Sequence, residues 1–298
     1  MPTPFLSVVI VTWNSERWIQ SCLESLVQQT WRTFETIIVD NNSQDTTLQL
    51  LHQYPVLTKQ MPRNVGFCEG VNQGYRIAKG NFIFVLNPDV RLKPDCLEKL
   101  VNAIQKIDSD IGMIAPKLLN LEGNRIDTVG IKLSIIRRLF NIGEGEVDQG
   151  QYDHKTEIFG PCGAAAVYSR QMLEILTSKG EVFDPIFFAY AEDFDLCWRA
   201  QRAGFRALFV PSAVGCHARG GSAIEKEKKQ YLSWRNRYFL LLKNESLWNF
   251  LIRSTLMFFY DFPRLLYFLI MNSYRWKALE EVSTVGFRLL KNRRKFGS

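Results

Sequence analysis

Three carboxylates within four positions, Glu192, Asp193 and Asp195, begin a segment with a helical pattern. The positive end of a helix dipole favours the ionised form of carboxylates in the first turn. An ionised carboxylate in a cleft can act as a general base and take a proton from a sugar hydroxyl. Taken alone, the cluster is more typical of an ordinary acidic helix start, and Asp195 can simply pair with Arg199 four residues later.

A second chemical signal follows the apolar run 82–86, where the chain reads Asn87-Pro88-Asp89. A carboxylate at a strand end is a hard oxygen ligand that suits Mg²⁺ or Mn²⁺ bridging a diphosphate. A helix cap would explain Asp89 equally well. His217 precedes Gly220 and Gly221 in a segment typical of a loop that faces phosphate, although a lone histidine is more often structural.

Two further segments carry polar side chains. Asp40 could accept hydrogen bonds from a ribose or a base, but Asn41 and the residues after it make Asx turns an equal alternative. Arg63 could face a phosphate, because Gly66 permits close approach of the backbone. An ordinary glycine turn explains that segment as well.

Alternating strands and helices must position these side chains. Ligands of such folds bind beyond the carboxyl ends of the strands, and the polar runs 12–14, 40–42 and 87–89 stand at such ends. The alternation predicts an α/β fold of Rossmann-like type, with a mostly parallel sheet flanked by helices. Short β-branched or apolar runs predict strands at 7–11, 36–39, 82–86, 111–115 and 206–210. Apolar periodicity and capping residues predict helices after 15, from about 46, from 94 to 107, from 169 to 177 and from 192 to 203, with a loop-rich connection over 120–160.

Composition limits the class of protein. The chain has 298 residues, of which 46% are apolar and 22% charged, which excludes a disordered or fibrous protein. The six cysteines form no CxxC pair, so a structural zinc site is not expected. The first residues carry no basic side chain and lead into a strand, so we expect no export signal and a reducing, cytoplasmic location.

The last quarter has a different charge, and we place a boundary between a catalytic domain over 1–223 and an extension over 224–298. The extension holds 15 Lys and Arg against 6 Asp and Glu, a balance of +9, whereas residues 1–223 balance at −2. A nucleic-acid-binding protein would spread its basic residues differently, and this basic segment is also strongly apolar. We therefore expect no nucleic-acid partner.

The extension is rich in large apolar residues, with 16 of 22 apolar from Phe250 to Met271. Arg253, Asp261, Pro263 and Arg264 interrupt this run, so two short interfacial helices broken near residue 262 fit better than one membrane span. We expect the extension to bind an anionic membrane surface, on the inner face of the cell membrane, helped by the basic residues of 288–295. Packing on the catalytic domain, an oligomer contact and a true span are the alternatives.

Taken together and in order, these segments resemble glycosyltransferase family 2, a group of inverting enzymes with the GT-A fold that use nucleotide sugars. The resemblance runs from Ser7 to about Ser222, roughly three quarters of the chain. Seven motifs carry it: SVVIVTWN at 7–14, IIVDNNSQDTT at 37–47, RNVGFCEGVNQG at 63–74, NPD at 87–89, GPCGAAAVYSR at 160–170, FFAYAEDFDLCWRAQRAGF at 187–205 and HARGGS at 217–222.

The resemblance implies a donor side. It assigns the nucleotide sugar to one set of residues, namely Thr12, Asn14, Asp40, Arg63, Asn64 and Asn87. Asp89 corresponds to the metal carboxylate of the family's Asp-x-Asp element, and His217 to a histidine that completes the metal or diphosphate contact. Asn87 departs from this element by replacing its first carboxylate, which predicts weaker binding of Mg²⁺ or Mn²⁺.

The resemblance also implies a catalytic and an acceptor side. Asp193 corresponds to the catalytic base, with Glu192 beside it to contact the acceptor or orient the site. Gly163 and Ala164 correspond to a small-residue turn near the acceptor, and Trp198 is placed on the same side. Asp193 would take the proton of an acceptor hydroxyl that attacks the anomeric carbon opposite the leaving group, which inverts that centre.

The most similar branch of the family includes rhamnosyltransferases that build cell-surface polysaccharides. This favours dTDP-rhamnose as the donor and a saccharide or a lipid-linked saccharide as the acceptor. Transfer from another donor, such as a UDP-sugar, is the first alternative. A catalytically inactive protein that binds nucleotide sugars or acts as a scaffold is the second, and Asn87 is the feature that favours it.

Overall fold

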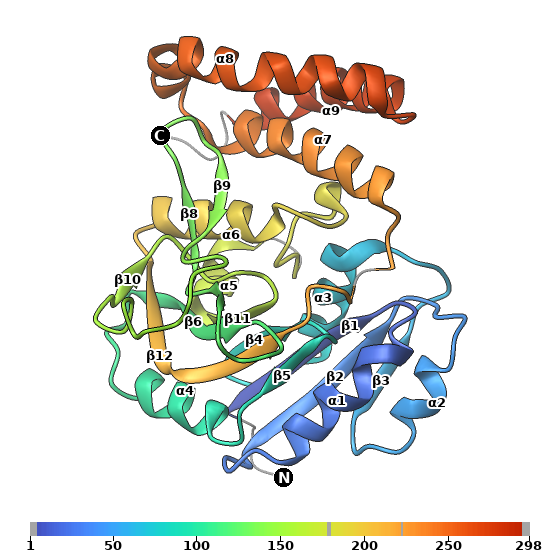
Figure 1. Cartoon of the computed structure of the whole chain (residues 1–298), viewed down its shortest axis with the longest axis vertical. Helices are drawn as coiled ribbons and strands as arrows, with labels where there is room; N and C mark the ends of the chain where they lie inside the picture. Colours follow the sequence, from blue (N-terminus) through green and yellow to red (C-terminus); the bar gives the residue numbers. More distant parts are fainter. Residues whose placement is uncertain (1–4, 178–179, 222, 294–298) are drawn as a thin grey trace.

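The computed structural model describes residues 5–177, 180–221 and 223–293, and its core is one large mixed sheet (Figure 1). Ten strands form that sheet: β1 (Leu6–Thr12), β2 (Phe34–Asp40), β3 (Leu57–Gln60), β4 (Phe82–Leu86), β5 (Val90–Leu92), β6 (Ile111–Leu119), β7 (Ile126–Thr128), β10 (Glu157–Ile158), β11 (Ala165–Ser169) and β12 (Arg206–His217). A separate hairpin joins β8 (Ile131–Leu133) to β9 (Leu139–Asn141). The five strands expected from the sequence are all present, and the segment 120–160 contains short strands between its turns.

The sheet is mostly parallel at its centre. Its main path runs β10-β12-β6-β11-β4-β1-β2-β3. β4, β1, β2 and β3 pair in parallel, as do β6 and β12. β11 pairs antiparallel with both β4 and β6, so these two strands point in the same direction. The carboxyl ends of β1, β2 and β4 therefore meet at one edge, where Thr12 pairs with Asp40.

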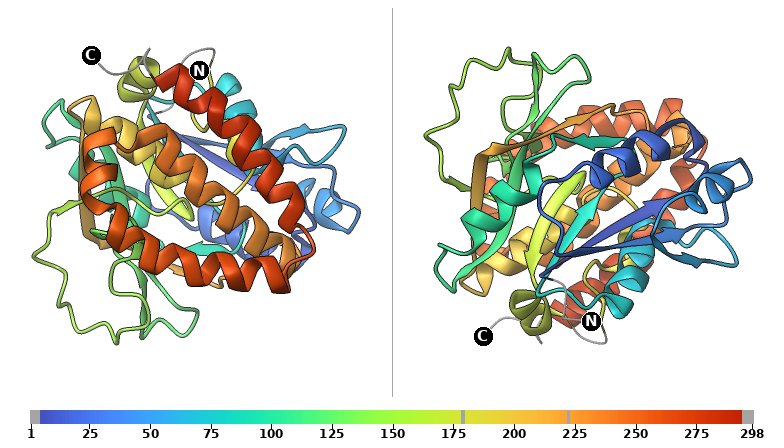
Figure 2. Two further views of the ribbon diagram at one scale, coloured as in Figure 1. Left: turned by 90° about the horizontal axis from the view of Figure 1, so that it is seen from above. Right: turned by 90° about the horizontal axis from the view of Figure 1, so that it is seen from below.

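Helices cover both faces of the sheet. The core on one face includes buried side chains of α1 (Glu16–Val27), α2 (Thr47–Leu51) and α4 (Cys96–Ile104). The core on the other face includes those of α3 (Gly66–Ile77), α5 (Arg170–Leu176) and α6 (Glu192–Arg202). Figure 2 shows α1 on the face opposite to the C-terminal helices. This arrangement confirms the expected α/β architecture.

Three helices follow β12 and lie on the α6 side of the sheet: α7 (Lys226–Asn244), α8 (Leu247–Met271) and α9 (Arg275–Arg293). Figure 1 shows α8 farthest from the sheet, with α7 nearer to α6. Residues 294–295 of the basic run 288–295 lie outside the described residues. In the part of the chain that the structure describes, no helix is long and apolar enough to cross a membrane.

The expected break near residue 262 is wrong, because α8 is one helix of 25 residues with Pro263 inside it. Proline lacks the backbone N–H that would bond to the carbonyl of residue 259, and it normally kinks a helix. Contacts on both sides of the proline hold this helix together. Met257 and Phe268 are buried, and Asp261 forms an ion pair with Arg237 of α7 at 2.7 Å.

Candidate active site

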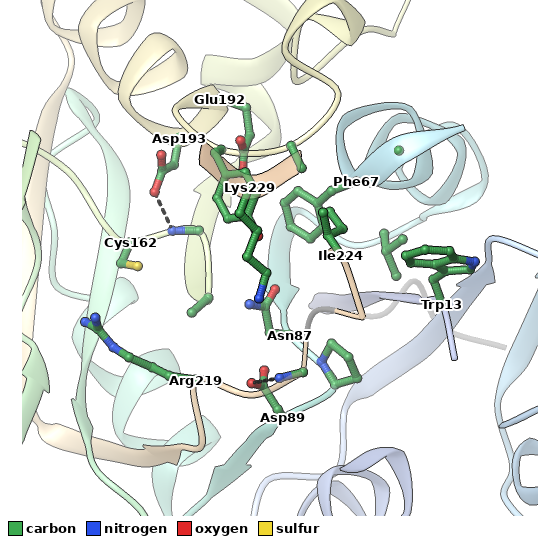
Figure 3. Close-up of a pocket in the computed structure, with 18 of the residues that line it drawn as sticks. Trp13, Phe67, Asn87, Asp89, Cys162, Glu192, Asp193, Arg219, Ile224 and Lys229 are labelled. Atoms are coloured by element: carbon green, nitrogen blue, oxygen red, sulfur yellow. Dashed lines mark hydrogen bonds between the residues drawn. The ribbon is translucent and has the colours of Figure 1, made fainter. Parts of the chain in front are cut away.

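A cavity of about 550 Å³ lies beyond the carboxyl ends of β1 and β4 (Figure 3). Its wall combines strand ends, the start of α6, the end of β12 and the start of α7. The strand ends contribute Thr12, Trp13, Asn87 and Asp89, α6 contributes Glu192 and Asp193, β12 contributes His217, and the C-terminal part contributes Ile224, Lys229 and Ser233. The two candidate sites of the sequence analysis, the metal carboxylate and the base, thus share one cavity.

Asp89 occupies one end of this cavity and is almost fully buried. Its Oδ2 accepts hydrogen bonds from the backbone N–H groups of Gly220 and Gly221, at 3.0 and 2.7 Å. A Cβ at Gly221 would lie 2.5 Å from the carboxyl carbon of Asp89, so this close approach requires glycine. Although burial opposes it, the hydrogen bond and charge of His217 and the N–H of Gly221 lower the pKa of Asp89. The carboxylate is therefore held in its ionised form.

His217 lies between two carboxylates. Its Nδ1 is 2.9 Å from Asp127 Oδ2, and its Nε2 is 3.4 Å from Asp89 Oδ1. Although burial opposes it, Asp127 and Asp89 raise the pKa of His217 to about 9. Asp127 also accepts a hydrogen bond from Arg219, whose guanidinium pairs in addition with Glu144. Sequence reasoning missed Asp127, because it lies in the loop-rich segment 90 positions from its partner and carries no local motif.

The residues at this end fit a divalent cation that binds together with a diphosphate. Among the described residues, no group of three or more His, Cys, Asp and Glu side chains is arranged to hold a metal by itself. Asp89 offers an oxygen at the cavity wall. His217 would offer Nε2 once a bound cation displaces the proton that its raised pKa holds there, and the hydrogen bond from Nδ1 to Asp127 would orient the ring. Mg²⁺ in nucleotide sites commonly takes one or two carboxylates and fills the rest of its shell with phosphate oxygens and water.

Glu192 and Asp193 occupy the other end of the cavity, at the first turn of α6. Asp193 Oδ2 accepts a hydrogen bond of 2.9 Å from the backbone N–H of Gly163, and its Oδ1 accepts one from the N–H of Phe194. Glu192 is buried, and its Oε2 has no partner among the described residues. Burial and the charge of Asp193 raise the pKa of Glu192 to about 8, and burial raises the pKa of Asp193. The raised pKa makes Asp193 a better proton acceptor, whereas Glu192, with a pKa of about 8, already carries its proton at neutral pH.

Asp195, the third carboxylate of the cluster, has a structural role. It is fully buried and bonded to Arg199, Lys243 and Asn244, at 2.9, 2.9 and 2.8 Å. Although burial opposes it, the charges of Lys243 and Arg199 lower the pKa of Asp195 to about 2. A carboxylate that two cations hold ionised is a poor proton acceptor, so Asp195 joins α6 to α7 and is not a candidate base.

The segment that leads into α6 is strained. Phe188, Tyr190 and Ala191 have φ angles of 63°, 71° and 68°, in the left-handed region that residues other than glycine rarely adopt. Gly66 makes room for this segment, since a Cβ there would lie 2.6 Å from the ring of Phe188 and 2.7 Å from its carbonyl oxygen. Gly66 itself has a φ of +88°. This confirms the expectation that it permits close backbone approach.

Two side chains of α7 hold the strained segment in place. Asn236 Nδ2 donates to the carbonyl oxygens of residues 187, 189 and 190, at 2.9, 2.8 and 2.7 Å. Arg235 Nη2 donates to those of residues 186 and 187, at 3.0 and 3.1 Å. The boundary after residue 223 stays a prediction, but α7 lies beyond it and positions the residues that precede Glu192 and Asp193.

The structure brings together most, but not all, of the residues assigned to the donor. Thr12, Asn64 and Asn87 line the cavity. Asn14 lines a neighbouring pocket of about 490 Å³, which shares Gly221 with the first one.

Asp40 and Arg63 lie outside that set. Asp40 is fully buried and absent from the lining residues that the structure describes. Its carboxylate accepts hydrogen bonds from Thr12 Oγ1 at 2.9 Å and from Ser43 Oγ at 2.6 Å, so it shapes the turn under the cavity wall. Arg63 is exposed and is likewise absent from the described lining residues.

The residues assigned to the acceptor side divide in the same way. Gly163 and Ala164 line the cavity, and the carbonyl oxygen of Ala164 accepts a hydrogen bond from the N–H of Asn87 at 2.9 Å. Trp198 is absent from the described lining residues, since it lies further along α6. Its ring contacts Phe159 edge to face, and the guanidinium of Arg137 lies 5.1 Å from its centre.

Comparisons with known proteins point to one class of enzyme. The hexosyltransferase Agl10 of low-salt glycan biosynthesis, from Haloferax volcanii, is 24% identical over 239 residues, which is 78% of this chain and 74% of that protein. The first three curated relatives are matched over only 34%, 30% and 35% of their own lengths.

Solved structures share the fold. Residues 1–349 of Staphylococcus aureus TarS, in complex with UDP-GlcNAc, superpose with a TM-score of 0.58 at 20% identity, covering 81% of this chain and 67% of that one. The mannosyltransferase PcManGT of Pyrobaculum calidifontis, in complex with GDP-Man and Mn²⁺, gives a TM-score of 0.57 at 14% identity, covering 98% and 74%.

The sequence profile described as Glycosyl transferase family 2 matches residues 7–176. This stretch covers β1 to α5 and includes Asp89, and it makes up more than half of the chain. The chain therefore belongs to glycosyl transferase family 2.

Proposed function

We propose that the chain transfers a sugar from a nucleotide sugar to a hydroxyl group of an acceptor, with inversion at the anomeric carbon. The proposal rests on one observation: carboxylates with a lowered pKa and carboxylates with raised pKa values lie at opposite ends of one cavity. Asp89 is held ionised at one end, and Asp193 and Glu192 have raised pKa values at the other. A leaving group that gains negative charge and a nucleophile that loses a proton need these two environments.

The residues divide the work between them. Thr12, Asn64 and Asn87 line the cavity and are assigned to the nucleotide sugar. Asp89 and His217 would hold Mg²⁺ or Mn²⁺ against the diphosphate, and the cation would neutralise charge on the leaving group. Asp193 takes the proton of the acceptor hydroxyl as that oxygen attacks the anomeric carbon. Gly163 fixes Asp193 for this task, because its N–H binds one carboxylate oxygen at 2.9 Å.

The donor is proposed to be dTDP-rhamnose, with a UDP-sugar as the alternative. TarS was solved with UDP-GlcNAc and PcManGT with GDP-Man, so related folds accept different nucleotides and sugars. The acceptor is proposed to be a saccharide or a lipid-linked saccharide of cell-surface polysaccharide synthesis. Agl10, a hexosyltransferase of glycan biosynthesis, supports an acceptor of this kind.

The test is release of nucleoside diphosphate from a panel of dTDP-, UDP- and GDP-sugars, with Mg²⁺ or Mn²⁺ and with saccharide acceptors. We expect turnover with one nucleotide class, loss of turnover in chelator, and a product of inverted anomeric configuration by NMR. Retention of configuration would contradict Asp193 as the base. Binding of a nucleotide sugar without any turnover would support the inactive, scaffold alternative.

The proposal also places the protein on an anionic membrane surface, at the inner face of the cell membrane. The outer side of α8 exposes large apolar side chains, among them Trp248, Phe259 and Ile270, at 78%, 71% and 74% exposure. Residues 224–298 carry a balance of +9. Apolar burial and attraction to anionic lipid both favour interfacial binding, at about 1 kcal/mol per basic residue near the surface. A membrane location suits an acceptor carried on a lipid.

Vesicle co-sedimentation tests this location. Truncation after residue 222 would remove Arg235 and Asn236 from the active site, so point substitutions are the better variants. We expect the full chain to bind anionic vesicles at low salt and to be released only partly at high salt, because the apolar contribution resists screening. The triple substitution Trp248→Ser, Phe259→Ser and Ile270→Ser should abolish binding, whereas Ile175→Ser, at an exposed site on α5, should not. If the triple variant instead converts an oligomer to a monomer and neither protein binds vesicles, α8 is an oligomer contact.

A further inference from the structure

The charged side chains that line the cavity are mostly engaged with one another. Asp89 and Asp127 share His217, and Arg219 is paired with Asp127 and Glu144. Among the cationic side chains that line the cavity in the described residues, Lys229 is the one outside this network. Among the described residues it forms no ion pair, and its amino group makes no hydrogen bond to a side chain or carbonyl group. A free cation in a cavity with four carboxylates, Asp89, Asp127, Glu192 and Asp193, is an unusual feature that the proposed roles have not used.

Lys229 comes from the extension, in the first turns of α7, and its side chain reaches inward. Figure 3 shows the Lys229 side chain extending into the cavity toward Asn87, with Glu192 and Asp193 on one side and Asp89 on the other. Ser233, one helical turn later, lines the same cavity. The side chain is half-buried, so a negative charge placed beside it would be only partly screened by water.

The helix that carries Lys229 is rigidly attached to the catalytic domain. Arg235 and Asn236 bind the carbonyl groups of residues 186–190, as described above. Lys243 and Asn244, at the other end of the helix, bind Asp195 at 2.9 and 2.8 Å. The position of the Lys229 backbone beside the cavity is therefore set by buried contacts of α7 and does not depend on a surface loop.

We infer that Lys229 binds the diphosphate of the donor and neutralises charge on the leaving group, so that the extension supplies one residue of the donor site. The inference rests on the proposed function. In the transfer, the bond between the anomeric carbon and the β-phosphate oxygen breaks, and its electron pair stays on that oxygen. The acceptor oxygen forms the new bond, and its proton passes to Asp193. An ammonium group beside the phosphate oxygens stabilises this added charge, and such charge-assisted hydrogen bonds are about twice as strong as neutral ones.

The test compares Lys229→Met with Lys226→Met, both in the full chain. Lys226 begins the same helix but is exposed and absent from the described lining residues, so its loss removes the same charge without emptying the site. In titrations with UDP, dTDP and GDP at fixed Mn²⁺, we expect Lys229→Met to weaken binding of the preferred nucleotide about tenfold or more. Lys226→Met should match the wild-type protein, and Lys229→Arg should retain most of the affinity.

Limited acetylation of the wild-type protein, followed by mass spectrometry, is a second readout that does not depend on a variant. The nucleoside diphosphate should protect Lys229 and leave Lys226 reactive. Equal affinities of the two methionine variants, or no protection of Lys229, would overturn the inference while leaving nucleotide binding intact. If the wild-type protein binds none of the nucleotides, the proposed function itself fails, and the two failures are thus distinguishable.

Discussion

Asp89, at one end of the cavity, has two backbone N–H groups on one oxygen and a histidine facing the other, whereas Glu192, at the opposite end, has an oxygen with no described partner. The pKa of Asp89 is lowered, and the pKa values of Glu192 and Asp193 are raised. All three side chains are buried to a similar degree, at 5%, 6% and 9% exposure. Burial raises the pKa of all three carboxylates, and only at Asp89 do the partners outweigh it.

This difference separates two tasks. The Asp89 end is built to hold fixed charge, since each carboxylate there faces a cation or an N–H group. The Asp193 end is built to exchange a proton, because a carboxylate with a raised pKa is a better base near neutral pH. Asp195 shows that carboxylates close together on one helix can have pKa values shifted in opposite directions. It lies two residues from Asp193 on the same helix, yet the cations Lys243 and Arg199 lower its pKa to about 2.

The largest effect should follow from removing the base. Asp193→Asn keeps the shape of the side chain and an oxygen for the Gly163 N–H, but it cannot accept the acceptor proton. We expect transfer to fall by about 10²–10⁴, the usual contribution of a general base, while donor affinity is retained. Steady-state turnover and nucleotide titration on the same protein check both parts.

The neighbouring carboxylate is the control for this prediction. Glu192→Gln should reduce transfer less than Asp193→Asn, because it leaves the base in place. A larger loss in Glu192→Gln would transfer the role of base to Glu192. Loss of donor binding in Asp193→Asn would place Asp193 at the donor and remove the contrast between the two ends.

The next effect concerns the end that holds fixed charge. Asp127 accepts from His217 Nδ1 at 2.9 Å and so orients the ring whose Nε2 faces Asp89. Asp127→Asn should weaken Mn²⁺ binding in the presence of nucleoside diphosphate by about 10–100-fold, as is usual when the carboxylate partner of a metal-binding histidine is removed. Electron paramagnetic resonance of free Mn²⁺ measures this affinity without reference to turnover. Asp89→Ala should abolish metal-dependent binding.

Glu144→Gln is the matched control, because Glu144 also pairs with Arg219 but does not contact His217 in the structure. It should leave Mn²⁺ affinity unchanged. If Asp127→Asn and Glu144→Gln behave alike, Asp127 acts through Arg219, and the orientation of His217 does not determine metal affinity.

The sequence predicts the parts of this site that local patterns encode. Asp89 and Thr12 follow apolar, β-branched runs, and the three carboxylates from Glu192 begin a helix, so both ends of the cavity are visible as motifs. Asp127 and Lys229 carry no such signal, since each reaches the site through tertiary packing from a segment without a motif. Asp40 shows the opposite case. Its position at a strand end is right, but hydrogen bonds from Thr12 and Ser43 occupy its carboxylate inside the wall.

The C-terminal helices show a similar limit. Composition identifies a basic and apolar extension, but composition cannot separate α7, which holds the active-site segment through Arg235 and Asn236, from α8, which is exposed on its outer side. Pro263 favours a break by local rules, and the pair between Arg237 and Asp261 holds the helix through it. Tertiary contacts on both sides of a residue can stabilise a conformation that its local propensity disfavours.

The smallest effect is on stability, and its dependence on pH tests the proton-exchanging end directly. The pKa of Glu192 is raised from about 4.5 to about 8 in the folded protein, so folding takes up a proton in this range. The stability that this group contributes is complete below pH 4.5 and is lost as the pH rises through about 8. Glu192→Gln removes the titration, so the variant should gain stability relative to the wild-type protein as the pH rises from 5 to 9. One pKa unit corresponds to ~1.4 kcal/mol, and we expect at least this gain at pH 9, or roughly 2–4 °C in Tm.

Thermal unfolding of both proteins between pH 5 and pH 9 measures this difference. Glu174→Gln, at an exposed position of α5, is the control, and its Tm should stay parallel to that of the wild-type protein. The contribution of Asp195 to stability depends on pH in the opposite direction. Its lowered pKa contributes stability that is lost only as the pH falls through about 2. A difference between Glu192→Gln and the wild-type protein that does not change with pH would mean that Glu192 ionises normally in the folded state. The contrast between the two ends of the cavity would then rest on Asp193 alone, whose pKa is raised by burial.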